Sequence, residues 1–459
     1  MAPRPGRRGR AVAAGTASDR AWLLRGGDVL VMDDAGTVAR ADVRVRGQRI
    51  VAVAPGLSRE GDEVVVDATG CVILPGFVQT HIHLCQTLFR NLADDLSLLE
   101  WLKERIWPLE GAHDRESLRA SAELGIAELL LGGTTAIVDM GTVHHTDAIF
   151  EALAEGGLRA VAGKCMMDAP DVPASLAETT AASLAESRRL AERWDGAEGG
   201  RIRYGYAPRF VLSCTDELMR EVAKDAAERG LWVHTHSSEN RTEVDIVRAR
   251  SGGQGNVAHL AGLGLRGPKT VLAHCIHLDP EEVLELEAAG TRVSHCVSSN
   301  LKLGSGVANV PGLLAAGVHV SLGADGAPCN NRMCAFTEMR TAALVQKPVH
   351  GPTAMPAPEV LRLATRAGAE VLGLGDELGQ VRPGFLADLQ VLALDGLGDG
   401  PGGDYASRVV YAATRSAVRD VFVDGHRLVA DRRLVRWDAR EIAKRAAARL
   451  AEVRKRAGV

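Results

Sequence analysis

The stretch Pro75-Gly76-Phe77-Val78-Gln79-Thr80-His81-Ile82-His83 begins with a Pro-Gly turn and ends with two histidines at positions i and i+2. It follows the apolar run Cys71-Val72-Ile73-Leu74, so a strand is predicted on either side of the turn. Because alternate side chains of a strand share one face, both imidazoles are expected to point the same way. Such a pair suits one metal ion. A lone His-x-His is more often structural, however, so the rest of the chain must decide.

Short apolar strands recur along the chain and alternate with segments of helical periodicity at residues 116–131, 216–229, 280–289 and 357–369. Together with the strand that contains His81, eight such strands are expected. Eight β-α units predict an α/β fold, a (β/α)8 barrel of the TIM type, whose functional side chains gather at the C-terminal ends of the strands. The other seven strands are expected at residues 135–139, 159–164, 203–207, 231–236, 270–274, 291–295 and 318–325.

Both ends of the chain show a different sequence pattern, in which short predicted strands are separated by Gly and Asp turns. Residues 21–74 and 376–435 are therefore expected to form one small β-sandwich domain, and residues 75–375 to form the barrel. Residues 436–459 are expected to contain a C-terminal helix. Residues 1–20, whose first eighteen residues include four arginines and no acid, are expected to be a disordered extension. The terminal strands are expected at residues 28–32, 41–45, 50–53, 63–66, 387–392, 408–411 and 419–425.

The composition indicates an enzyme that acts on a small molecule. The 459 residues are 46% hydrophobic and have a net formal charge of −4 with no concentrated basic face, which gives no reason to expect binding to nucleic acid or to a membrane. No apolar run approaches the ~20 residues needed to span a bilayer. The eight cysteines form no CxxC pair, so most are expected to be reduced and buried in a cytoplasmic protein.

Several predicted barrel strands end in a residue that can bind a metal ion or transfer a proton. These residues are His81 and His83 on the first strand, His236 on the fifth, His274 on the sixth and Asp325 on the eighth. Imidazoles with a carboxylate suit Zn²⁺, and Fe²⁺ is also feasible. A structural zinc site is closed and more often uses cysteine, so the pattern favours an open, catalytic site.

The chain resembles the amidohydrolase superfamily, in particular its branch of aminohydrolases that deaminate purines, nucleosides and s-triazines. The resemblance implies one Zn²⁺ per subunit, with His81, His83, His236 and Asp325 as the metal ligands. It also implies that Glu239 and His274 serve the attacking water and the leaving group. The motifs that carry the resemblance are Pro75-Gly76-Phe77 through His83, His236-Ser237-Ser238-Glu239, Ala273-His274-Cys275, Ser298-Ser299-Asn300 and Gly323-Ala324-Asp325-Gly326.

The chemistry of these residue types agrees with the resemblance. A metal ion lowers the pKa of bound water towards ~7, and Asp325 can take the proton that the attacking water loses. Glu239 can protonate a ring nitrogen, which makes the adjacent carbon electrophilic, and His274 can orient the water and stabilise the tetrahedral intermediate. His234 is expected to support the ligands. Lys164 ends the third strand, not the fourth strand that supplies a bridging lysine in two-metal relatives, so one metal ion is expected.

The segment after the first histidines resembles deaminases of 5'-modified adenosines, in which residues at the positions of Trp101 and Glu110 line the nucleoside pocket. A carboxylate can accept hydrogen bonds from both ribose hydroxyls. Gln86 and Arg209, in contrast, resemble purine-reading residues of guanine deaminases. Arginine carries five donors and no acceptor, so it favours a carbonyl or an acidic group.

The sequence therefore predicts a zinc-dependent hydrolytic deaminase of a 5'-modified adenosine that releases an inosine-type product and ammonia. Suitable substrates are 5'-deoxyadenosine, methylthioadenosine, adenosylhomocysteine and 6-amino-6-deoxyfutalosine. The alternatives are a guanine deaminase and an s-triazine amino- or chlorohydrolase. A metal-binding protein without activity is disfavoured, because every ligand and Glu239 are intact. The resemblance also implies a homo-oligomer.

Overall fold

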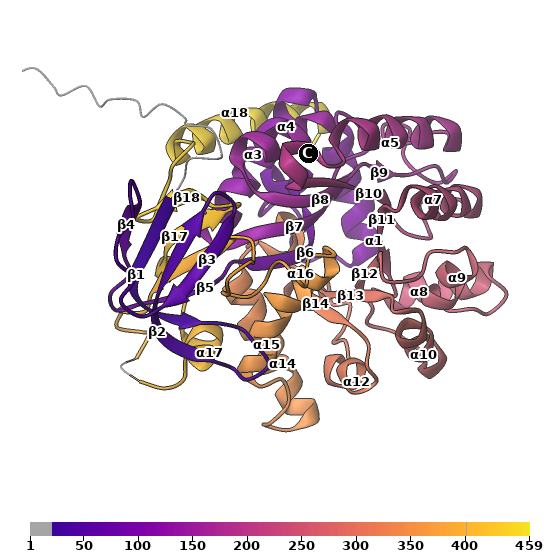
Figure 1. The fold of residues 1–459 in the computed structure, drawn as a ribbon. Helices are drawn as coiled ribbons and strands as arrows, with labels where there is room; N and C mark the ends of the chain where they lie inside the picture. The colour runs from indigo at the N-terminus through magenta and orange to yellow at the C-terminus, as the bar shows by residue number, and fades with distance from the viewer. Residues whose placement is uncertain (1–20, 401) are drawn as a thin grey trace, which may run out of the picture.

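The computed structural model describes residues 21–400 and 402–459. The predicted disordered extension at residues 1–20 lies outside the described residues. The described chain forms a barrel of parallel strands surrounded by helices, and a second sheet that strands from both ends of the chain build together (Figure 1). The prediction of a TIM-type barrel with a small β domain is confirmed.

Eight parallel strands form the barrel, and each pairs with the next one in the order of the sheet. The C-terminal ends of parallel strands lie at one end of a barrel, so the polar residues at these positions share one opening. The strands are β6 (Phe77–His83), β7 (Thr134–Met140), β8 (Arg159–Gly163), β10 (Ile202–Pro208), β11 (Trp232–Ser237), β12 (Thr270–His274), β13 (Arg292–His295) and β14 (Val320–Leu322).

The barrel closes between its last and first strands. The chain leaves β14 and forms a two-residue strand, β15 (Asp325–Gly326), in which Asp325 pairs with Ile82 of β6. Inside the barrel, the Thr80 hydroxyl lies 2.7 Å from the hydroxyls of both Ser294 and Ser321. Small polar side chains therefore join the first, seventh and eighth strands where backbone pairing is sparse.

Helices cover the outside of the barrel. Most expected helices are present, including the C-terminal one, which lies along α3 (Figure 1). The helical elements are η2 (Leu84–Phe89), α1 (Leu98–Trp101), η3 (Leu102–Ile106), α2 (Trp107–Gly111), α3 (Arg115–Leu131), α4 (Asp147–Gly156), α5 (Thr180–Trp194), α6 (Ala197–Gly200), α7 (Asp216–Arg229), α8 (Arg241–Arg250), α9 (Asn256–Gly262), α10 (Pro280–Ala289), α11 (Val297–Lys302), α12 (Val310–Ala315), α13 (Ala327–Asn330), α14 (Ala335–His350) and α18 (Ala439–Ala457).

The single helix predicted at residues 357–369 is wrong, because the chain forms two helices there, α15 (Ala357–Leu363) and α16 (Arg366–Val371). They are separated at Thr365, whose backbone is not helical. The break frees the Ala364 carbonyl, which accepts a hydrogen bond from the Val78 backbone N–H of β6 at 2.8 Å. The need to bond the first barrel strand therefore outweighs the continuous helical periodicity.

The second sheet joins strands from both ends of the chain. The two sets meet where β5 pairs antiparallel with β16, and the sheet curls so that Trp22 and Phe422 pack edge to face at 5.5 Å. Its order is β19-β18-β17-β16-β5-β1-β2-β3, with β4 beside β1. The strands are β1 (Ala21–Leu30), β2 (Val38–Arg46), β3 (Arg49–Ala54), β4 (Val64–Asp67), β5 (Cys71–Pro75), β16 (Leu389–Ala393), β17 (Val418–Val423), β18 (His426–Ala430) and β19 (Arg433–Leu434).

The strand predicted at residues 408–411 is also wrong. The chain is helical there, in α17 (Tyr405–Ser407) and the π-helix η4 (Arg408–Ala412). The consecutive residues Val409 and Val410 are both fully buried in the core that includes the barrel helices. Consecutive residues of a strand point to opposite faces, so an edge strand with one exposed face would bury only one of the two valines.

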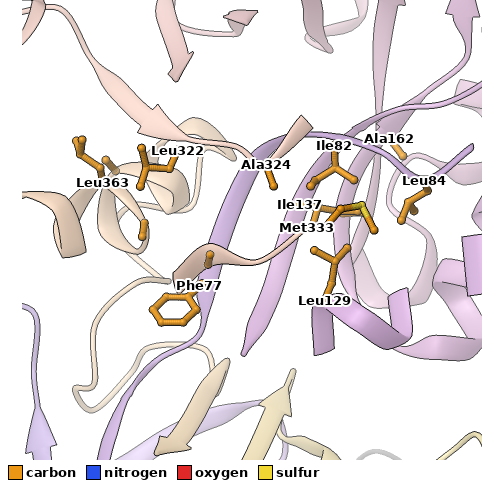
Figure 2. Packing of buried hydrophobic residues seen from close by; sticks show 14 of the residues in the cluster. Phe77, Ile82, Leu84, Leu129, Ile137, Ala162, Leu322, Ala324, Met333 and Leu363 are labelled. Atoms are coloured by element: carbon orange, nitrogen blue, oxygen red, sulfur yellow. The ribbon is translucent and has the colours of Figure 1, made fainter. Parts of the chain in front are cut away.

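The barrel and the second sheet are joined by buried contacts. Arg159 begins β8, and its guanidinium donates to Asp388 (2.8 Å) and Asp424 (3.0 Å), which belong to the C-terminal part of the second sheet. Gly76 separates β5 from β6, and a Cβ atom there would lie 2.1 Å from the side chain of Thr135. Figure 2 shows part of the apolar core of the barrel, with Ile82 and Met333 among the labelled side chains.

All eight cysteines are free, and seven of them are buried. Among the described residues, no helix combines the length and the apolar character needed to cross a membrane. The domain boundaries after residues 74, 375 and 435 stay predictions.

Candidate active site

Four polar side chains converge at the C-terminal ends of the barrel strands. His81 and His83 come from β6, His236 from β11 and Asp325 from β15. All four are buried or nearly so, and one ligand atom from each lies within 4.8 Å of the others. The Nε2 atoms of His81 and His83 each lie 3.2 Å from Asp325 Oδ1. We call these four residues the metal-ligand cluster.

The hydrogen bonds around this cluster show why it suits a cation. His83 donates its Nδ1 hydrogen to the carbonyl of Met140 at 2.9 Å, and His236 donates its Nδ1 hydrogen to the carbonyl of Arg209 at 2.6 Å. A carbonyl can only accept, so in the neutral form of each ring the Nε2 atom carries the lone pair. These two atoms are 3.3 Å apart. Two lone pairs that face each other repel unless a cation lies between them, so the donor set fits a metal ion.

His81 completes the set and is supported by a further histidine. Its Nδ1 atom lies 2.7 Å from Nε2 of His234, as expected for a residue that orients a ligand, while its buried Nε2 atom has no hydrogen-bond partner among the described residues. Burial lowers the pKa of His81 to about 4, so the ring is neutral at physiological pH and can bind a cation. The structure therefore contains a His/Asp metal-binding group.

Glu239 and His274 lie beside the metal-ligand cluster. His274 donates its Nδ1 hydrogen to Asn300 Oδ1 at 2.8 Å, which leaves its Nε2 atom 3.5 Å from Glu239 Oε2 and 3.9 Å from Asp325 Oδ2. The Oε1 atom of Glu239 is buried without a partner in the described part of the chain. Burial and the nearby charge of Asp325 raise the pKa of Glu239 well above its usual range, which favours the protonated form of its carboxyl group.

The backbone is strained where these side chains leave their strands. Ser238, His274 and Asp325 all have left-handed backbone angles, with φ values of 55°, 74° and 61°. Non-glycine residues in this region cost free energy and are held there by their surroundings. In Asp325, for example, Oδ2 accepts a hydrogen bond from the Ser299 hydroxyl at 2.7 Å.

A pocket opens onto the cluster. Apolar, aromatic and polar side chains all contribute to its lining. The lining residues are His83, Gln86, Leu98, Trp101, Leu102, Arg209, Phe210, His236, Glu239, His274, Leu303 and Asp325.

The four predicted substrate-binding residues lie in or behind this pocket. Gln86, Trp101 and Arg209 line it, whereas Glu110 does not. Glu110 instead accepts hydrogen bonds from Arg209 Nη1 at 2.6 Å and from Gln86 Nε2 at 2.8 Å. In this arrangement its carboxylate holds the two side chains in place. The indole Nε1 of Trp101 is buried, and no described residue accepts a hydrogen bond from it.

Lys164 is not part of the metal-ligand cluster. It follows β8, the third barrel strand, and its ammonium group pairs with Glu178 and donates to the carbonyl of Cys165 at 3.0 Å. The structure also brings to the site several residues that had no predicted role. These are Leu98, Leu102, Phe210 and Leu303 in the pocket and Glu243 behind Glu239.

Comparison with known proteins places this geometry in a family. The sequence matches the Amidohydrolase family over residues 72–428. The chain belongs to the amidohydrolase family. The resemblance noted in the sequence motifs is therefore confirmed.

Several similar proteins share nearly the full length of the chain. A 5'-deoxyadenosine deaminase of Methanothermobacter thermautotrophicus is 39% identical over 432 residues, which are 94% of this chain and 98% of that protein. A 5-methylthioadenosine/S-adenosylhomocysteine deaminase of Haloarcula marismortui is 38% identical over 439 residues, 95% of this chain and 99% of that protein. An adenosine deaminase of Xanthomonas campestris, solved with bound zinc, superimposes with a TM-score of 0.89 at 31% identity and covers 95% and 98% of the two chains.

The family and these relatives support a hydrolytic deaminase that acts on C–N bonds, which confirms the class of enzyme predicted from the sequence. The buried His/Asp group agrees with the metal dependence that is typical of the family.

Proposed function

We propose that the protein is a zinc-dependent deaminase that converts a 5'-modified adenosine into an inosine-type product and ammonia. The observation that carries the proposal is the position of Glu239 and His274 beside the metal-ligand cluster, in the lining of one pocket. The activities for which the relatives are named, on 5'-deoxyadenosine, methylthioadenosine and adenosylhomocysteine, support this substrate class.

His81, His83, His236 and Asp325 are the residues that would hold the zinc ion. A zinc ion bound there supplies Lewis acidity and lowers the pKa of water towards ~7. Three imidazoles and one carboxylate satisfy its preference for nitrogen and oxygen ligands, and one ion per subunit accounts for the whole donor set. Iron(II) is the alternative metal.

The chain's own residues then move the protons. Asp325 takes the proton that the attacking water loses, and its other oxygen stays fixed by Ser299. Protonated Glu239 donates to a ring nitrogen next to the reacting carbon, so that this carbon accepts the water oxygen. His274, whose Nε2 lone pair is fixed by Asn300, orients the water. The proton held by Asp325 then passes to the amino group, which leaves as ammonia, while the new hydroxyl group returns its proton to Glu239 and becomes a carbonyl.

Guanine deamination is the second candidate, and one observation favours it. Arg209 and Gln86 line the pocket, whereas Glu110, the predicted ribose-binding carboxylate, is held behind them. A fixed guanidinium favours a carbonyl oxygen, which guanine has and adenine lacks. An s-triazine hydrolase is the third candidate, which would use the same metal and Glu239 but no ribose contact.

Ammonia release by the zinc-loaded protein tests the proposal. The panel contains 5'-deoxyadenosine, methylthioadenosine, adenosylhomocysteine, 6-amino-6-deoxyfutalosine, adenosine, guanine and melamine. We expect a kcat/KM above about 10⁴ M⁻¹s⁻¹ for at least one 5'-modified adenosine, which lies in the usual range for enzymes, and no turnover of guanine. Turnover of guanine alone would replace the proposal with the second candidate.

A further inference from the structure

Glu243 is a fully buried carboxylate near the active site that has no role in the chemistry described above. It lies in the first turn of α8 and is 0% exposed. Its hydrogen-bond partners among the described residues are all N–H donors, namely the backbone of Glu239, the backbone of Asn240 and the side chain of Asn256. A buried carboxylate without a cation needs such donors, because an unsatisfied charge costs several kcal/mol.

The hydrogen-bond distances show which backbone N–H group Glu243 holds most closely. Glutamate at the third position of a helix commonly accepts from the N-cap backbone N–H, which here belongs to Asn240 and lies 3.3 Å away. The shorter bond, 2.8 Å, goes to the backbone N–H of Glu239, one residue before the cap. The Glu243 carboxylate therefore lies closer to the backbone N–H of Glu239 than to the N-cap N–H of its own helix.

This bond completes a clamp on one peptide group, the Ser238–Glu239 peptide. Its carbonyl oxygen accepts from the backbone N–H groups of Ile276 (2.9 Å) and His277 (3.0 Å), which follow β12. Its N–H donates to Glu243. Ser238 has the left-handed φ of 55°, so the turn needs support from its surroundings. The orientation of this peptide sets the direction in which the Glu239 side chain leaves the backbone.

We propose that Glu243 is a positioning residue that holds Glu239 against His274 and the reacting ring nitrogen. The inference rests on the proposed function, because it assumes that Glu239 is the proton donor. Removing the Glu243 carboxylate frees one end of the Ser238–Glu239 peptide, and a misplacement of ~1 Å is sufficient to slow catalysis about a hundredfold.

Substitution of Glu243 by alanine and by glutamine separates position from charge. In E243Q the amide oxygen can still accept from the Glu239 N–H. The glutamine N–H group can donate to the side chain of Asn256. The buried Oδ1 atom of Asn256 accepts from no described residue, and a flip of the Asn256 amide turns this oxygen towards the glutamine. We expect E243A to lower kcat about a hundredfold with KM changed less than about threefold, and E243Q to keep kcat within about threefold.

Glu282 provides a matched control. It occupies the same position of another helix, α10, is also buried, and accepts from the backbone N–H groups of Asp279 (3.0 Å) and Val257 (2.8 Å). These bonds fix the first turns of α10 and α9, and the Glu239 backbone N–H still donates to Glu243. We expect E282A to lower the melting temperature about as much as E243A while kcat stays within about twofold of the wild type. Equal losses of kcat in the two variants would overturn the inference.

Two further measurements distinguish positioning of Glu239 from a general loss of packing. In a Glu239→Gln background, adding E243A should change the residual kcat by less than about threefold, because the group that Glu243 positions is already gone. A loss of kcat as large as in the wild-type background would contradict the inference. Amide hydrogen exchange of the peptide covering residues 237–243 does not depend on activity. The Glu239 amide should exchange at least about tenfold faster in E243A than in E243Q or E282A.

The outcomes separate the two proposals. If no purine nucleoside is turned over, the proposed function fails, and the exchange rates alone decide whether Glu243 fixes the Glu239 backbone. If nucleosides are turned over but E243A behaves like E282A, only the inference about Glu243 fails.

Discussion

Replacing Arg209 with methionine should strongly destabilise the protein, because it leaves a buried carboxylate without its cation. Arg209 and Glu110 are 2.6 Å apart, and their side chains are only 5% and 2% exposed. Removing one partner of such a pair costs about 3–5 kcal/mol. Among the described residues, Glu110 would keep its hydrogen bond from Gln86 and a weak contact with the Cys85 thiol.

The size of the effect follows from the length of the chain. Unfolding entropy is about 2.1 cal/mol/K per residue, so 459 residues give about 1 kcal/mol per kelvin if the chain unfolds in one transition. R209M should therefore lower the melting temperature by about 3–5 °C. Differential scanning calorimetry of protein with equal metal content measures this shift. Substitution of the exposed Arg40, which is 3.3 Å from Asp28, serves as the control and should change it by less than about 1 °C.

A second substitution in the same protein tests the cause. E110Q removes the unpaired charge and keeps an oxygen that can accept from Gln86, so the double variant R209M/E110Q should regain at least about half of the lost stability. An unchanged melting temperature in R209M would show that water or another cation compensates the negative charge of Glu110. A double variant less stable than R209M would show that packing, and not charge, explains the loss.

Four other changes test the site and the electrostatics of the fold. Glu239→Gln should keep the bound metal while kcat falls by about a thousandfold or more, since an amide cannot donate the proton; unchanged turnover would refute its role. Asp325→Asn should lower both the metal content, measured by atomic emission, and the activity. His234→Ala should weaken metal affinity about 10–100-fold, because His81 loses the partner of its Nδ1 atom; titration with a metal indicator measures this. Burial lowers the pKa of His113 to about 4 in the folded protein, below its unfolded value of 6.5. The neutral ring therefore contributes stability above pH 6.5, and this stability is lost as the pH falls towards 4. The loss at pH 5 is about 2 kcal/mol, or about 2 °C, and H113N should show a flatter profile of melting temperature against pH.

The sequence was sufficient to predict the barrel, because the signal for it is local. Each strand is a short apolar run, and each of the ligand candidates stands at or near the end of one. The rule that parallel strands carry their functional groups at the C-terminal end then brings residues as distant as His81 and Asp325 together. The segment around Val409 could not be predicted in the same way. Two consecutive valines suit a strand locally, and only the contacts with the barrel helices decide for a helix.

The pocket was harder to predict than the metal-ligand cluster. Trp101, Glu110, Gln86 and Arg209 were identified separately as parts of two different substrate sites. Only the structure shows that Glu110 is bonded to both Arg209 and Gln86, which is a contact between elements far apart in the chain. The contact of Glu243 with the Glu239 backbone could not be predicted either, because it depends on the strained turn at Ser238.

The pairing of β5 with β16 has a consequence for the order in which a ribosome produces the fold. The N-terminal strands emerge first, but their partners at residues 389–393 and 418–430 follow more than 300 residues later. At about 5–20 residues per second, the interval is about 20–70 seconds. During this time one edge of β5 has no neighbour, although the strand continues through Gly76 into the barrel. Nascent chains that stop before residue 389 should therefore bind chaperones or proteases through this edge, and chains released after residue 430 should not.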